Sequence, residues 1–299
     1  DKAGIPILLL SAIFRQRQCY CKGYGCFLRK ALRRVTHLYV QDTLSADLLG
    51  SLGIREATVS GDTRFDRVVE ILEAPRELPF MERFRGERTC MVFGSTWPED
   101  HEILLPFINA SEKGCCFVIA PHKTDPKTIE ALQKGIRQPS ALYSERADAA
   151  LGEVSVLIID TIGLLTQIYR YADLAYVGGG FATGLHNTLE PAVFGVPVLI
   201  GPQFEGFREA EEMVAAGGVQ VVRDAAGFSS RADELMTNPG LRREIGNLNT
   251  RYIQKNKGAS DQMGSEVLPL ACEYQVMSVQ AMLNAPLPSS PWNPAMRTQ

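Results

Sequence analysis

The sequence lacks several features that mark common classes of protein. Its formal net charge is only −3, from 31 Lys and Arg against 34 Asp and Glu, so no basic excess indicates a nucleic-acid partner. No apolar run is long enough to span a bilayer, and no internal repeat is evident. What remains is an ordinary composition: hydrophobic residues make up 45%, enough for buried cores, and 299 residues suggest about two domains.

The cysteines show no paired CxxC spacing, which argues against a disulfide framework or a zinc ribbon. Cys19, Cys21 and Cys26 could be considered as metal ligands, but a fourth partner at a normal interval is missing and Gly23 and Gly25 make the region loop-like. We therefore expect no structural zinc and reduced, mostly buried thiols. The seven cysteines are Cys19, Cys21, Cys26, Cys90, Cys115, Cys116 and Cys272.

Acidic residues are absent between Lys2 and Gln41. The same segment carries aromatic and aliphatic side chains, among them Phe14, Tyr20 and Phe27. Two interpretations fit this mixture: a solvated basic helix face, or a surface that meets anionic lipid. Composition alone favours the solvated face. The basic residues are Lys2, Arg15, Arg17, Lys22, Arg29, Lys30, Arg33 and Arg34.

Short apolar runs alternate with helical patterns along most of the chain, which predicts α/β folding with parallel sheets covered on both faces. We expect residues 1–66 to be the last part of one such domain, 67–88 to link the domains, 89–270 to form a second domain, and the proline-rich 271–299 to be an irregular tail. The expected strands are 7–10, 37–40, 57–60, 90–93, 117–119, 154–159, 174–177, 196–200 and 219–222.

The stretch from Tyr176 to Ala192 is the most informative in the chain. An apolar strand ends in Gly178-Gly-Gly180, and a polar cluster with a helix start follows. Glycines allow positive φ and close backbone approach, while the N–H groups of a helix start attract negative charge. Because another apolar strand follows, the sequence predicts a βαβ unit that binds an anion at the carboxyl end of its first strand.

Seven segments in chain order, including this one, resemble the bacterial Kdo transferases, which move 3-deoxy-D-manno-octulosonic acid (Kdo) from CMP-Kdo to a lipid A precursor of lipopolysaccharide. The resemblance covers roughly residues 5 to 270 and implies a GT-B fold, with two Rossmann-like doubly wound domains of which the first is incomplete. It also reverses the preference at the basic segment, because the acceptor is an anionic glycolipid at the membrane. The other six segments are Ser11–Arg15, Gly61–Asp66, Gly94–Trp97, Ala120–Lys123, Asp160–Leu165 and Gly201–Phe204.

The resemblance implies a donor site made of segments that each follow an apolar strand. Asn187, Thr188, Leu189 and Glu190 would contact CMP, with Glu190 accepting from the ribose hydroxyls; a plain capping box, with Asn187 as N-cap and Glu190 at N3, is the structural alternative. His186 would lie beside the phosphate, where partial protonation could help to neutralise it. Further donor-binding residues would be Pro121, His122, Gly163, Leu164 and Leu165, and Ser95, Thr96, Gly179 and Gly180 would lie near the phosphate or sugar.

The chain departs from the family pattern at two of these positions. His122 stands where the family usually has arginine, so a bidentate phosphate ligand is replaced. Leu164 stands where the family usually has glutamate, which leaves only backbone contacts there. The segments at 163–165 and 94–96 could equally be an ordinary strand-to-helix turn and a helix cap.

No catalytic residue is assigned, because no segment matches the family's general base. We expect that glutamate upstream of Asp1, and we expect this chain alone to be inactive. The resemblance implies no metal or other cofactor. The expected partners are CMP-Kdo, a lipid A precursor and the anionic cytoplasmic face of the inner membrane, with Arg15, Arg17, Arg29, Lys30, Arg33 and Arg34 on the membrane or acceptor surface. The alternatives are a non-catalytic nucleotide-sugar-binding module and a GT-B transferase that uses a UDP-sugar.

Overall fold

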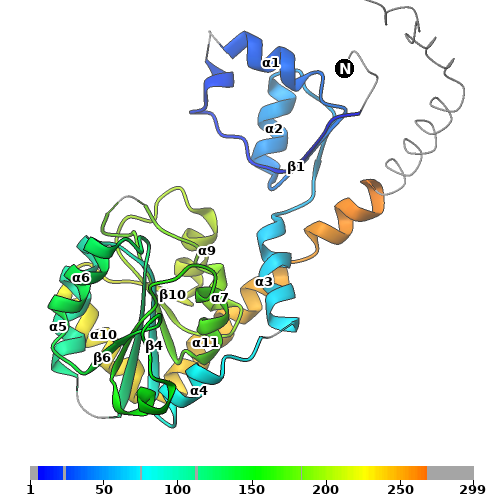
Figure 1. Ribbon diagram of the computed structural model, residues 1–299. Helices are drawn as coiled ribbons and strands as arrows, with labels where there is room; N and C mark the ends of the chain where they lie inside the picture. Colours follow the sequence, from blue (N-terminus) through cyan, green and yellow to red (C-terminus); the bar gives the residue numbers. More distant parts are fainter. Residues whose placement is uncertain (1–5, 23–24, 75, 112–113, 183, 268–299) are drawn as a thin grey trace, which may run out of the picture. The chain divides into compact units, whose positions relative to one another are not determined.

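The computed structural model describes residues 6–22, 25–74, 76–111, 114–182 and 184–267 (Figure 1). The chain divides into two compact units: residues 1–61 with 258–299, and residues 62–257. This division differs from the expected boundaries, because 62–88 belongs to the second unit and 258–267 to the first. The proline-rich tail at 271–299 lies outside the described residues.

The first unit is built on a parallel three-stranded sheet in the order β1-β2-β3. Helix α2 begins where the buried Asp42 side chain accepts a hydrogen bond from the Ser45 N–H (2.7 Å). Residues 259–267 are helical, and Ala259 and Met263 pack against Tyr39 of β2. The elements are β1 (Leu8–Ala12), the 3₁₀ turn η1 (Cys19–Cys21), α1 (Cys26–Leu32), β2 (His37–Val40), α2 (Thr43–Ser51) and β3 (Ala57–Val59).

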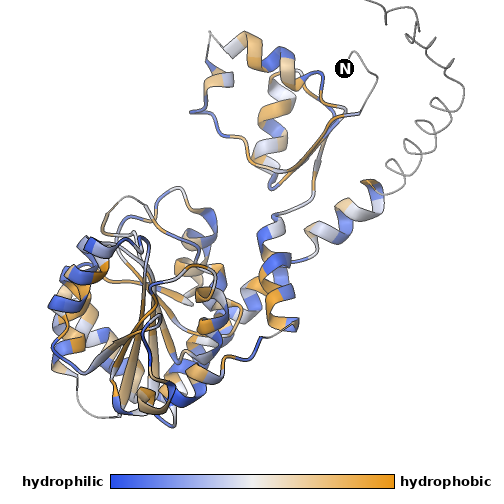
Figure 2. Ribbon diagram, viewed as in Figure 1, coloured by the Kyte–Doolittle hydropathy of each residue, from blue (hydrophilic) through white to orange (hydrophobic). Residues whose placement is uncertain are grey.

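The second unit is a seven-stranded parallel sheet in the order β10-β9-β8-β4-β5-β7-β6, with helices on both faces (Figures 1 and 2). Its strands are β4 (Thr89–Thr96), β5 (Cys115–Pro121), β6 (Ser140–Leu142), β7 (Val156–Ile158), β8 (Leu174–Val177), β9 (Val198–Ile200) and β10 (Val219–Val221). The sequence patterns predicted every strand but β6, a short edge strand whose Ser140 is exposed and whose other residues are only half-buried.

Side chains of β4 alternate between two cores. Cys90 and Val92 enter the core under one set of helices, while Met91 and Phe93 enter the other, as the period-two geometry of a strand buried on both faces requires. The first core includes residues of α3 (Thr63–Glu73), α4 (Pro79–Arg85), α8 (Leu189–Ala192), α9 (Arg208–Ala216) and α11 (Pro239–Asn256). The second includes residues of α5 (Pro98–Ala110), α6 (Pro126–Gly135) and α10 (Ala225–Thr237). The shorter turns are η3 (Asp148–Glu153), α7 (Leu165–Ile168) and η4 (Tyr169–Tyr171).

The expected linker at 67–88 is largely helical instead. Helices α3 and α4 bury Phe65, Val68, Phe80, Met81 and Phe84 in the core of the second unit. Apolar residues at helical spacing inside this charged segment produce the packing. The many charged residues around them led the sequence analysis to interpret the segment as a linker.

The cysteines only partly follow the expectation. All six that are described are free thiols, but Cys19 and Cys26 are exposed, and only Cys90 and Cys116 are fully buried. The expectation of mostly buried thiols was therefore wrong for the first unit, where these residues lie on short surface elements. Cys272 lies outside the described residues.

Candidate active site in the second unit

The strand order changes direction next to β4. The chain runs from β4 to β5 on one side and later returns to place β8 on the other side. Ligands of open α/β sheets bind outside the carboxyl ends of the strands at such a switch point. The carboxyl ends of β8, β4 and β5 carry Gly178–Gly180, Ser95–Trp97 and Pro121–His122 respectively, so the structure brings these three predicted segments together at one edge.

The glycine turn after β8 is required by the close approach of neighbouring backbone. A Cβ on Gly178 would lie 2.5 Å from the Ser95 carbonyl oxygen, and one on Gly180 would lie 2.7 Å from the Gly201 backbone. Gly179 has a φ of +94°, which confirms the predicted positive φ in this turn. The three glycines therefore let β4, the turn and the end of β9 meet at van der Waals distance.

Asp100, which the sequence analysis did not single out, connects the end of β4, the glycine turn and β8 through hydrogen bonds. Its carboxylate is fully buried and accepts three hydrogen bonds: from the Trp97 N–H (2.8 Å), the Gly179 N–H (2.9 Å) and the Tyr176 hydroxyl (2.6 Å). Burial and this carboxylate raise the pKa of Tyr176, so its hydroxyl stays a donor. In the sequence, an acidic residue in the first turn of a predicted helix was the signal that could have pointed to Asp100. Its contacts with β8 could not be foreseen, because they depend on the fold.

Three aromatic rings stack beside the glycine turn. Trp97 lies over His122 with ring centroids 4.5 Å apart, and His122 lies over His186 at 4.6 Å. The Trp97 Nε1–H donates to His186 Nε2 (3.0 Å), and the Lys123 ammonium lies 5.1 Å from the Trp97 ring centroid. His122, predicted as a donor contact, is exposed at this edge. Trp97 was missed as a site residue because only its neighbours Ser95 and Thr96 were interpreted chemically.

The environment of His186 favours the neutral imidazole. Burial lowers its pKa and the neighbouring His122 lowers it further, while Asp100 opposes them more weakly. An Nε2 that accepts from Trp97 carries no proton, so the remaining ring proton is on Nδ1. The expected aid from a partly protonated His186 is therefore not provided by this arrangement, in which the ring is an acceptor and a stacking surface.

The predicted CMP segment at 187–190 begins helix α8. The Asn187 side-chain oxygen accepts from the Leu189 N–H (3.1 Å), and its amide donates to Glu190 Oε1 (3.1 Å). The predicted capping box is not formed, because the N-cap of α8 is Thr188 and not Asn187, and Glu190 contacts the Asn187 side chain and not its backbone N–H. Leu189 is fully buried, and the buried Thr188 hydroxyl has no hydrogen-bond partner among the described residues.

Glu190 also joins the segment at 163–165 to the site. Thr166 of α7 donates from its hydroxyl to Glu190 Oε2 (3.0 Å). Gly163, at the exposed start of this turn, has a φ of +96°. Leu164 and Leu165 are half-buried and pack against the first core, so only the backbone of this turn offers polar groups. Because each Glu190 oxygen has one protein partner, each keeps capacity to accept from another donor.

Ser95 and Thr96 behave differently from each other. Thr96 is buried, and its hydroxyl is bonded to His101 Nε2 (2.9 Å), so it is already engaged. Ser95 is half-buried with a φ of +54°, a left-handed conformation that is costly for a residue with a Cβ. Strain of this kind concentrates at functional sites, and here it turns the chain between β4 and α5.

The basic segment of the first unit is only partly a free cationic surface. Arg15 pairs with the buried Asp42 (2.9 Å), Arg29 donates to the carbonyl of Tyr20 (2.6 Å), and Arg33 donates to that of Leu52 (3.0 Å). Burial raises the pKa of Asp42, but hydrogen bonds from Arg15 and Ser45 outweigh it and lower the pKa.

Among the aromatic residues of this segment, Phe14 and Tyr20 are buried in the core of the unit, whereas Phe27 is 79% exposed and Leu28 is exposed beside it. Arg17, Lys30 and Arg34 are exposed as well. In the part of the chain that the structure describes, no helix is long and apolar enough to cross a membrane.

The chain is similar to a set of named transferases. Residues 1–67 match the family model described as 3-deoxy-D-manno-octulosonic-acid transferase. A 3-deoxy-D-manno-octulosonic acid transferase from Chlamydophila psittaci is 30% identical over 174 residues, covering 57% of this chain and 40% of the relative. The enzyme of the same name from Bordetella pertussis is 26% identical over 271 residues, covering 86% of this chain and 62% of the relative. The chain thus spans less than two thirds of the length of these relatives.

The fold comparison rests on the solved structure of a single domain. The crystal structure of the C-terminal CMP-Kdo binding domain of WaaA from Acinetobacter baumannii superposes with a TM-score of 0.52 at 20% identity, covering 64% of this chain and 97% of that domain. At this identity the match is evidence of fold alone. By sequence, the chain is similar to the Kdo transferases, and its α/β fold is similar to that of the CMP-Kdo binding domain of one of them.

Proposed function

We propose that this chain carries the donor site of a Kdo transferase, which moves Kdo from CMP-Kdo to a lipid A precursor in lipopolysaccharide biosynthesis. The observation that carries the proposal is the convergence of Gly178–Gly180, His122 and Asn187–Glu190 at the switch point of a doubly wound sheet. The sequence relatives that bear this enzyme name support the same conclusion.

In this proposal CMP lies along α8 and the turn at 163–165. Glu190 accepts from the ribose hydroxyls with the lone pairs that Asn187 and Thr166 leave unused. The backbone N–H groups near Gly163 and the Thr188 hydroxyl supply further polar contacts. Lys123 provides positive charge near the phosphate, in the region where the family usually has arginine.

The test is calorimetric titration of CMP into the protein and two variants. Glu190→Ala should weaken CMP binding by about 1–3 kcal/mol, because a buried hydroxyl loses its acceptor. Glu244→Ala is the matched control, since Glu244 is exposed on α11 and has no hydrogen bond or ion pair to another described residue. Thermal unfolding of each variant checks that the fold is intact. Equal CMP affinity for the Glu190→Ala variant and the parent protein would refute the assignment of this residue.

The nucleotide base distinguishes this proposal from a UDP-sugar transferase. CMP should raise the unfolding temperature at concentrations where UDP does not, because a ligand stabilises the native state in proportion to its binding. Stabilisation by UDP alone would favour the UDP-sugar alternative. Binding of CMP without turnover of CMP-Kdo by the full-length protein would favour a non-catalytic module. Such a module is the second candidate, because His122 stands in place of the family's arginine and Leu164 in place of its glutamate.

We further propose that α1 places the protein on the cytoplasmic face of the inner membrane. Its exposed Phe27 and Leu28 adjoin Lys30, a combination that suits an anionic lipid surface. Because Arg15, Arg29 and Arg33 hold the unit together, the sharper test replaces Arg17 and Lys30 with glutamine. The free energy of binding to anionic vesicles, measured by sedimentation, should weaken by up to about 1 kcal/mol for each charge removed. Added salt should weaken the binding further. A Lys127 and Arg251 double glutamine variant is the control, because both residues are exposed in the second unit, and equal sedimentation of both variants would contradict the proposal.

A further inference from the structure

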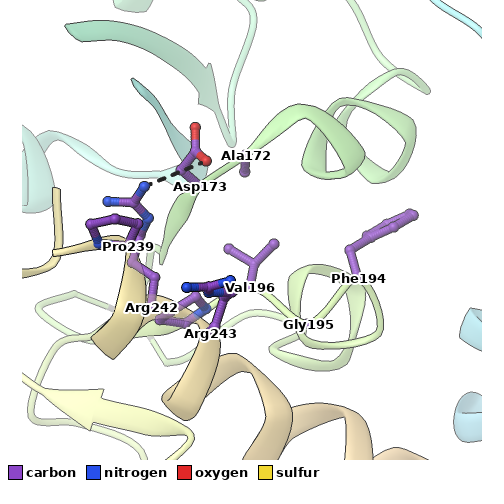
Figure 3. A pocket seen from close by; sticks show the side chains of 9 residues that line it. Ala172, Asp173, Phe194, Gly195, Val196, Pro239, Arg242 and Arg243 are labelled. Carbon is purple, nitrogen blue, oxygen red and sulfur yellow. Dashed lines mark ion pairs between the residues drawn. The ribbon is translucent and has the colours of Figure 1, made fainter. Parts of the chain in front are cut away.

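A second pocket lies at the opposite edge of the second unit, where strands β8 and β9 begin. It has a volume of about 460 Å³ and is lined by the residues that precede these strands and by the first turns of α11 (Figure 3). This edge is separated from the candidate active site by the length of the strands. The volume falls in the range of small-molecule sites.

The acidic group of the pocket is already neutralised. Asp173 pairs with Arg85 (3.0 Å) and accepts from the Cys90 N–H (2.9 Å), both through Oδ2. Arg242 lies farther away, with its Nη2 at 3.9 Å from Asp173 Oδ1, while its Nη1 donates to the carbonyls of Leu235 and Met236 (2.8 and 2.7 Å). Arg242 is thus a fixed, largely buried guanidinium whose charge is not fully matched by Asp173.

Arg243 adds a second guanidinium with no fixed role. It is exposed, and it forms no hydrogen bond or ion pair with another residue in the described ranges. Figure 3 shows it on the Val196 side of the pocket, while Arg242 lies on the Asp173 side. Arg85, Arg242 and Arg243 together carry three positive charges against the one negative charge of Asp173, which leaves an excess of two.

The remaining wall is apolar. Phe194, Val196, Pro197 and Pro239 line the pocket beside the two arginines. A ligand that matches this lining carries two negative charges at one end and an apolar body at the other. Guanidinium groups bind phosphate oxygens in a bidentate manner, and the excess charge corresponds to that of a phosphate monoester dianion.

We propose that this pocket binds an organic phosphate monoester, with the phosphate on Arg243 and Arg242 and the organic group against Val196 and Phe194. The loop that supplies Phe194 and Val196 follows α8 directly, and Asn187–Glu190 lie at the start of the same helix. The pocket is nevertheless a separate site, because its lining shares no residue with the carboxyl edge of the sheet.

The experiment is a titration of the protein with phenyl phosphate, followed through backbone amide NMR signals. Ala172 and Gly195 report this pocket, whereas Gly179 and His186 report the opposite edge, so binding at the two edges is resolved. We expect the signals of Ala172 and Gly195 to shift at millimolar ligand or below. Arg243→Gln should weaken this binding at least about tenfold, and Arg243→Lys should weaken it less because the charge remains.

Arg251→Gln is the matched control, because Arg251 is exposed on the same helix and does not line the pocket. It should leave the affinity within about twofold. Inorganic phosphate should bind more weakly than phenyl phosphate, because it lacks the apolar group, and phenol should bind more weakly because it lacks the charge. Unmoved Ala172 and Gly195 signals, equal binding by the Arg243→Gln variant, or stronger binding of benzoate than of phenyl phosphate would each overturn the proposal.

Discussion

Removing the Asp100 carboxylate should both destabilise the second unit and loosen its glycine turn. Asp100→Ala leaves the N–H groups of Trp97 and Gly179 and the hydroxyl of Tyr176 buried without their acceptor. Hydrogen bonds to a charged group contribute about 1.5–3 kcal/mol each, and the desolvation of the carboxylate offsets part of their sum. We therefore expect a loss of about 3–5 kcal/mol in the free energy of unfolding, because three buried donors are left unsatisfied at about 1–3 kcal/mol each while the desolvation cost of the carboxylate is recovered.

Asp100→Asn provides a graded comparison. An asparagine oxygen placed where Oδ2 lies keeps both backbone N–H partners, and its amide faces Tyr176, whose hydroxyl can rotate to accept. The three contacts then remain but are no longer charge-assisted, so the expected loss is only about 1–2 kcal/mol.

Urea unfolding of the two variants and of Glu99→Ala measures these differences. Glu99 is the neighbouring acid in the first turn of α5 and is exposed, so its loss should cost less than about 1 kcal/mol. Amide signals of Gly178–Gly180 should shift strongly in Asp100→Ala and weakly in Asp100→Asn. A loss below about 1 kcal/mol for Asp100→Ala, or equal losses for alanine and asparagine, would refute the reasoning from the three hydrogen bonds.

Two further predictions concern stability. Burial lowers the pKa of both His101 and His186 from the ordinary 6.5, so below that pH the unfolded chain binds more protons and the free energy of unfolding should fall as the pH drops from 7 to 5. His186→Gln should flatten this dependence in urea titrations at several pH values; an unchanged slope would contradict it. Gly180→Ala should lower the free energy of unfolding by about 1–3 kcal/mol, because the new Cβ would collide with the Gly201 backbone. Gly50→Ala in α2, where a Cβ would meet no atom within 4 Å, should raise the free energy of unfolding by as much as about 1 kcal/mol. Thermal unfolding of the two variants compares them, and equal effects would argue against the close approach.

The location of the candidate site could be predicted because it depends on chain order and local pattern. Apolar strands that lead into Gly178, Thr96 and Pro121 must place these residues near the carboxyl edge of a parallel sheet, whatever the details of packing. The glycine turn was likewise foreseen, although its close approaches are to Ser95 and Gly201 of the protein itself. The boundaries at 66 and 88 were less predictable, because α3 and α4 carry a narrow apolar stripe in a charged segment.

Side-chain partners could not be predicted from the same patterns. Asp100 looks like an ordinary acid in a first helical turn, and only the fold brings Tyr176 and Gly179 to it. The resemblance implied that a partly protonated His186 could help to neutralise the donor phosphate, whereas its burial and the donor from Trp97 favour the neutral ring. Such errors arise because protonation and hydrogen bonding depend on atoms distant in sequence.

The exchange of arginine for His122 changes how this edge can hold a phosphate. A guanidinium at the end of β5 would present a planar fork, but the His122 ring instead stacks against both Trp97 and His186, which are hydrogen-bonded to each other. The next residue, Lys123, places its ammonium over the same tryptophan and so supplies a full positive charge beside the stack. An ammonium attracts phosphate without fixing its orientation. The N–H groups of Gly178 and Gly179 already donate to the Gly94 carbonyl and to Asp100, so these two amides of the turn do not replace the planar fork of a guanidinium. In this chain, Lys123 would therefore attract an anion to this edge without the geometric selection that an arginine provides.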